Sequence, residues 1–75
     1  SNFFPDAVTQ ISLSGKGDFT ADGTSFHSLL VLEGEAVLSW AEGQMTLKKG
    51  ESALVPAGLG GYSIEGKAEL VLTTI

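Results

Sequence analysis

Several residue types that commonly stabilise or charge a small domain are missing from this chain of 75 residues. Cysteine is absent, so no disulfide can support the fold, and nothing in the sequence argues for secretion. Arginine is absent too, and four lysines stand against nine carboxylates, which gives a formal net charge of −5. Nucleic-acid binding rests largely on neutralising phosphates. We therefore expect no nucleic-acid partner.

Long apolar runs are also lacking. No run approaches the roughly 20 residues that a helix needs to cross a bilayer, and no signal peptide is visible. We therefore expect no membrane partner and a cytoplasmic location. A chain of this length buries only roughly 60–65% of its unfolded surface, so its core is marginal without a partner.

Short stretches of alternating or apolar residues, separated by glycine-containing turns, fill most of the chain, and no segment has helical spacing. Turns are predicted at residues 15–18, 33–35, 48–51 and 65–67. The pattern predicts an all-β fold of about seven to eight antiparallel strands in one domain, residues 1–75. Ser1-Asn2 is interpreted as a cloning remnant. The expected strands cover residues 9–14, 19–20, 26–32, 36–40, 44–47, 52–55, 62–64 and 68–74.

His27 is the only histidine, and we interpret it as a hydrogen-bonded core or rim residue. Transition-metal sites use three or four side chains, and the carboxylates nearest in sequence, Asp22 and Glu33, both belong to turns. Ser25 and Ser28 flank His27 too closely along a strand to build a catalytic triad. No catalytic, cofactor-binding or metal-binding residue is therefore predicted.

Trp40 and Tyr62 are the candidate ligand-binding residues, because aromatic rings can stack on a sugar. We favour the simpler interpretation, in which both are large amphipathic side chains in the core or at its rim. Ligand binding is the alternative.

The stretch from Gly50 to Gly61 resembles the second conserved motif of cupins, with glycine, five residues, Pro56, one residue and Gly58. The segment 31–35 resembles the end of the first cupin motif. This resemblance implies a double-stranded β-helix, or jelly-roll barrel. The family's metal-ligand positions would fall on Ala21, Gly23, His27 and Gly61. Only His27 can bind a metal, so the resemblance implies a degenerate cupin without the metal centre.

Residues 30–38 and 47–62 look like the C-terminal domain of type I mannose-6-phosphate isomerases. That family interconverts mannose 6-phosphate and fructose 6-phosphate using one zinc, whose ligands lie upstream of the terminal domain together with the catalytic arginine. The resemblance implies a non-catalytic structural domain that holds no cofactor and packs against a preceding catalytic domain. Phe3, Phe4 and an apolar outer sheet face would then be exposed in the isolated chain, which predicts a homo-oligomer.

Two other functions are compatible with the sequence. The chain could be a free-standing, metal-free cupin that binds a small ligand such as a sugar at the mouth of its barrel, using Trp40 or Tyr62. It could also be an active metal-dependent cupin, if subunits pooled their ligands around His27.

Overall fold

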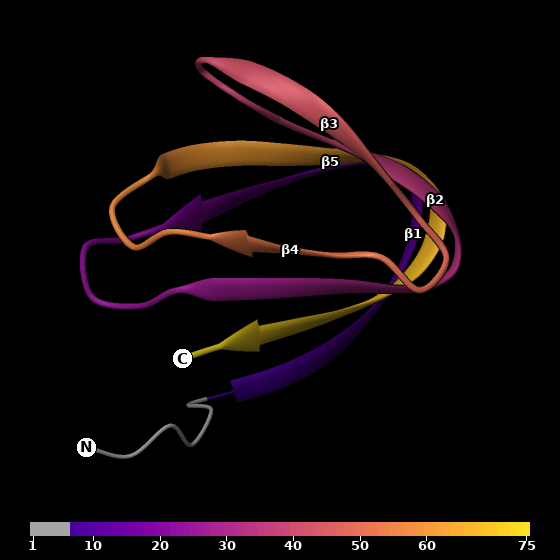
Figure 1. Cartoon of the computed structure of the whole chain (residues 1–75), viewed down its shortest axis with the longest axis horizontal. Helices are drawn as coiled ribbons and strands as arrows, with labels where there is room; N and C mark the ends of the chain where they lie inside the picture. The colour runs from indigo at the N-terminus through magenta and orange to yellow at the C-terminus, as the bar shows by residue number, and fades with distance from the viewer. Residues whose placement is uncertain (1–6) are drawn as a thin grey trace.

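The computed structural model describes residues 7–75, which form five β-strands and no helix. Three strands are long and two are short (Figure 1). No helix long and apolar enough to cross a membrane occurs among these residues. The strands are β1 (Ala7–Ala21), β2 (His27–Trp40), β3 (Gly43–Lys48), β4 (Ser52–Val55) and β5 (Gly60–Thr74).

All strand pairs are antiparallel, in the order β1-β5-β2-β3, with β4 also pairing with β2. The three long strands curve back over themselves, so that one sheet makes two layers (Figure 1). The first layer contains β4, which pairs with residues 27–30 of β2, together with residues 7–14 of β1 and 67–74 of β5. The second layer contains β3, which pairs with residues 35–40 of β2, together with residues 16–21 of β1 and 60–65 of β5.

The all-β antiparallel fold predicted from the sequence is confirmed. The predicted turns at residues 15–18, 33–35 and 65–67 were wrong, because all three lie inside continuous strands. Six of the eight expected strands are therefore the halves of β1, β2 and β5. The turn at 48–51 is correct: the Glu51 amide donates to the Lys48 carbonyl over 2.9 Å.

Glycines in the bends allow the long strands to change layers. Gly34 in β2 has φ 77°, and Gly66 in β5 has φ 148°, in the region that other residues rarely adopt. A Cβ on Gly34 would collide with the carbonyl oxygen of Lys67, and one on Gly66 would lie 2.5 Å from that of Glu35. Neighbouring backbones thus approach each other closely at the bend, where a side chain has no room.

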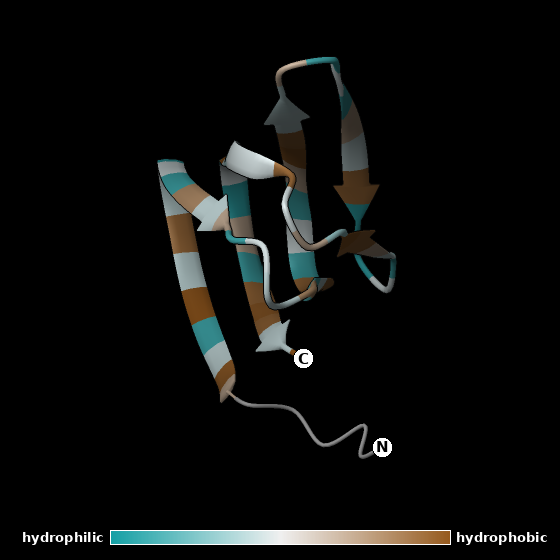
Figure 2. Cartoon of the chain, turned by 90° about the vertical axis from the view of Figure 1, so that its left-hand side faces the viewer, coloured by the Kyte–Doolittle hydropathy of each residue, from teal (hydrophilic) through white to brown (hydrophobic). Residues whose placement is uncertain are grey.

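The core fills the space between the two layers. Inward positions alternate with outward ones along each strand, as the banding of apolar and polar residues in Figure 2 shows. Leu29, Val31 and Leu70 of the first layer face inward and are fully buried, as is Ile64 of the second. The described residues bury no charged side chain.

Candidate functional site

The two layers are joined at their open end by a pair of polar side chains. His27 begins β2 in the first layer, and Tyr62 lies near the start of β5 in the second. His27 Nδ1 and the Tyr62 hydroxyl oxygen are 2.6 Å apart, a short hydrogen bond. The Phe19 ring stacks on Tyr62 with centroids 5.6 Å apart, and the His27 ring approaches it edge-on at 5.8 Å. We call His27, Tyr62 and Phe19 the mouth cluster.

The environment of Tyr62 keeps its hydroxyl protonated. Only 4% of the residue is exposed, and burial raises its pKa from 10.0 to about 12. A neutral phenol can donate to the Nδ1 lone pair of His27 when the imidazole proton sits on Nε2. The mouth cluster is thus a hydrogen-bonded pin between the layers.

The titration of Tyr62 can be measured directly, because the chain has one tyrosine. We expect absorbance at 295 nm to give a midpoint near 12 in the folded protein, and one near 10 in denaturant. Between those values the unfolded state releases a proton that the folded state keeps, so stability falls as pH rises. A folded-state midpoint at 10 would show that the hydroxyl is solvated.

Trp40 lies directly opposite Tyr62 in the β2–β5 register, so the structure brings together the two aromatic residues proposed as ligand contacts. A ring that stacks on a sugar must have an exposed face. Tyr62 does not, because it is buried and the Phe19 ring stacks on it. Trp40 packs against the core and lines a cavity of about 80 Å³ shared with β3, β4 and Pro56, well below the roughly 300–1,000 Å³ of pockets for drug-sized ligands. Trp40 and Tyr62 also line an open depression of about 560 Å³ on the second layer, together with Phe19. Ligand binding by either residue remains a prediction.

The sequence analysis did not identify Phe19 as part of the site and placed it only in a short expected strand. The signal that could have found it is its cross-strand register with Tyr62, which places both rings on the inner face. That pairing becomes visible only when residues 9–21 are read as one strand.

The cupin ligand positions offer no alternative set of donors. No group of three or more His, Cys, Asp or Glu side chains that could hold a metal occurs within residues 7–75. His27 already shares its Nδ1 with Tyr62. Asp22 Oδ1 accepts hydrogen bonds from the Thr24 hydroxyl over 2.7 Å and the Thr24 amide over 2.9 Å. These bonds lower the pKa of the Asp22 carboxyl, with the side-chain bond the larger cause. Zinc therefore does not fit the residues at this end of the fold.

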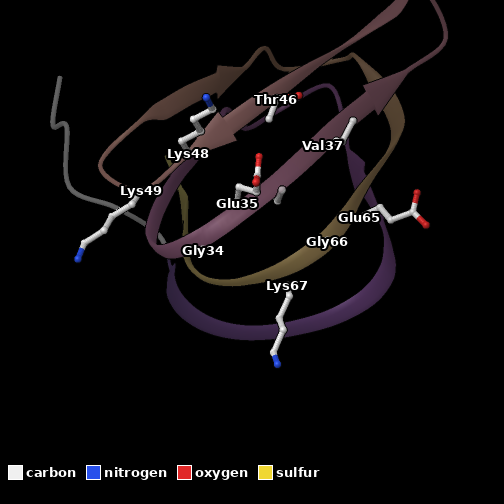
Figure 3. Close-up of a pocket in the computed structure, with 10 residues that line it drawn as sticks. Gly34, Glu35, Val37, Thr46, Lys48, Lys49, Glu65, Gly66 and Lys67 are labelled. Atoms are coloured by element: carbon white, nitrogen blue, oxygen red, sulfur yellow. The ribbon is translucent and has the colours of Figure 1, made fainter.

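A shallow depression at the outside of the bend gathers three of the four lysines: Lys48, Lys49 and Lys67. Figure 3 shows that their amino groups point in different directions rather than toward a common centre. Lys49 instead forms an exposed ion pair of 2.8 Å with Glu33. This geometry suits lysines that are solvated at the turn of residues 48–51, and it does not form an anion clamp.

Comparison with known protein families identifies the fold. The model of the mannose-6-phosphate isomerase cupin domain family matches residues 1–75. The chain belongs to this family. The resemblance seen in the Gly50–Gly61 and 31–35 segments is thus confirmed, and the chain is a cupin domain of mannose-6-phosphate isomerase type. No curated protein matches it.

Solved structures, two of them described as cupins, have the same fold as this domain. Protein NMB1881 from Neisseria meningitidis is 29% identical with a TM-score of 0.78, over 91% of this chain and 71% of that protein. A cupin-2 domain-containing protein from Shewanella frigidimarina is 18% identical with a TM-score of 0.71, over 89% of this chain and 65% of that one. The cupin domain of Cnp3 from Schizosaccharomyces pombe is 21% identical with a TM-score of 0.65, over 89% of this chain and 47% of that one.

Proposed function

We propose that this chain is a non-catalytic structural cupin domain of a zinc-dependent mannose-6-phosphate isomerase. In the parent enzyme, mannose 6-phosphate and fructose 6-phosphate are interconverted at a zinc held by a preceding catalytic domain. The cupin domain stabilises that domain by covering part of its surface. It contributes no ligand to the metal and no group to the reaction.

The observation that carries this proposal is the chemistry of the mouth cluster. In a cupin, this end of the sandwich is where inward side chains can gather around an ion. Here the one imidazole is bonded to a buried, neutral phenol whose other neighbour is a phenylalanine ring. Such a set has one metal-binding nitrogen, whereas zinc sites have three or four protein ligands.

Activity and metal content of the purified chain test the proposal together. We expect no conversion of mannose 6-phosphate above the buffer control with zinc supplied, and less than 0.1 zinc per chain after gel filtration. The coding sequence upstream should specify a zinc-ligand set and an arginine. Isomerase activity that disappears in His27→Ala, or one tightly held metal per chain, would overturn the proposal.

A sugar-binding role is the second candidate, favoured by the positions of Trp40 and Tyr62, which both line an open depression of about 560 Å³. The single tryptophan makes it testable by fluorescence. If the non-catalytic role is right, titration with mannose, fructose and their 6-phosphates leaves the Trp40 emission unchanged. A saturable change in Trp40 emission would assign the domain a ligand instead, provided that a truncation away from both hollows, such as Leu32→Ala, retains it.

A further inference from the structure

The outer surfaces of the two layers differ sharply in chemistry. The second layer is polar outside, with Lys16, Asp18, Ser39, Thr46, Ser63 and Glu65 at outward positions. The first layer carries most of the exposed large apolar side chains of residues 7–75. We call its outer surface the apolar face and define it by Val8, Phe26, Leu30, Leu54, Val71 and Ile75.

Strand register makes the apolar face continuous. Val71 of β5 lies opposite Leu30 of β2, and Leu54 of β4 is opposite Ser28, one outward position along from Leu30. Phe26 and Ile75 exchange two backbone hydrogen bonds of 3.0 and 2.9 Å and extend the same ladder. Leu54 is 63% exposed. Contiguous exposed apolar side chains of this kind mark interaction sites in soluble proteins.

Charge is nearly absent from this surface, although the chain carries 13 charged residues. Between the apolar side chains, the outward positions are Gln10, Ser28, Ser52 and Thr73. The ionic groups, Glu69 and the Glu33–Lys49 pair, lie toward the bend. Depletion of charge at the centre with polar groups at the rim is the pattern of protein interfaces.

We propose that the apolar face is the surface on which the catalytic domain of the parent enzyme docks, an inference that rests on the proposed function. The size of the face favours a tethered partner over a second copy. Three strand halves of about seven residues and the four-residue β4, spaced about 4.8 Å apart, cover at most roughly 20 × 20 Å. That area is about half of the ~800 Å² that each partner buries in a standard interface.

A covalent tether makes such an area sufficient, because a linked domain is present at millimolar effective concentration. The position at which β1 begins is consistent with a tethered partner. Strand β1 begins at Ala7, opposite Thr74 and next to Val8. A domain linked to this end of β1 is held beside the apolar face. The self-association expected from the sequence is then weak, and we expect none up to roughly 100 µM.

Hydroxyl-radical footprinting of the parent enzyme and of the 75-residue chain tests the assignment. We expect the oxidation rates of Phe26, Leu30 and Leu54 to fall at least fivefold in the parent. Val37 is the internal control, because it lies on the outer side of the second layer, opposite Thr46 and Glu65. Its rate should change less than twofold. In the parent, Leu54→Lys should restore Phe26 oxidation, and Val37→Lys should not.

The outcomes separate this inference from the proposed function. If the upstream sequence encodes no isomerase catalytic domain, both fail. If it does, and Phe26 and Leu54 are oxidised equally fast in the parent and the isolated chain, only the docking face is wrong. Protection of these residues in the isolated chain between 10 and 100 µM would assign the face to a second copy and also overturn the inference.

Discussion

Gly34→Ala should remove most of the stability of this domain. The left-handed conformation at φ 77° costs a non-glycine residue about 1–2 kcal/mol. The added methyl group also collides with the Lys67 carbonyl oxygen, which belongs to a paired strand and cannot rotate away. We expect a total loss of about 3–5 kcal/mol, in the range of severe strain and overpacking. A domain of this size has about 4–11 kcal/mol in all.

Substitutions at two other glycines separate the conformational cost of Gly34→Ala from the cost of its steric collision. Gly50 has φ 84° but open space where a Cβ would stand, so Gly50→Ala should cost only the conformational part, about 1–2 kcal/mol. Gly23→Ala meets no atom within 4 Å and should change stability by less than about 0.5 kcal/mol. Urea unfolding followed by circular dichroism measures all three. A Gly34→Ala midpoint equal to that of Gly50→Ala would show that the close approach at the bend does not matter.

The same glycine explains how far the sequence could predict the fold. Gly34 between two glutamates has the local signature of a hairpin turn, and the sequence predicted one. Strand β4 was placed correctly at Ser52–Val55, because a glycine turn and Pro56 bound it locally. Whether a glycine reverses a strand or only bends it depends on the pairing of residues far away in sequence, here Gly34 with Ala68. No local pattern contains that information.

The mouth cluster shows the same limit at the level of side chains. From the sequence, His27 was interpreted as a hydrogen-bonded residue rather than a metal ligand, because too few other metal-ligating side chains lie near it in the sequence. The structure gives this imidazole a hydrogen-bond partner in Tyr62, and the absence of a metal-ligand role stays a prediction. This partner, 35 residues away, could not be identified because the contact crosses from one layer to the other. An apolar outer sheet face was expected from the sequence, but which residues form it depends on the register of four strands. Phe3 and Phe4, expected to be exposed with it, lie outside the described residues.

Tyr62→Ala should be the most destabilising change in the mouth cluster. It removes a buried ring, leaves Phe19 without its stacking partner and ends the hydrogen bond to His27. Truncation of a large buried aromatic side chain costs about 3–5 kcal/mol. Tyr62→Phe keeps the ring and removes only the hydroxyl. It should cost about 1 kcal/mol, the usual net value of one hydrogen bond, because water can reach the half-buried imidazole.

A double-mutant cycle isolates the pin itself. If the hydroxyl acts on His27, then Tyr62→Phe should cost little further once His27→Ala is present, with a coupling energy of about 0.5–1.5 kcal/mol. Guanidinium unfolding followed by circular dichroism measures each of the four proteins. Met45→Ala on β3 is the matched control for a truncation outside the cluster, and it should add independently to Tyr62→Phe. Additive costs of His27→Ala and Tyr62→Phe would mean that the 2.6 Å contact contributes nothing to stability. The mouth cluster would then join the two layers by ring packing alone.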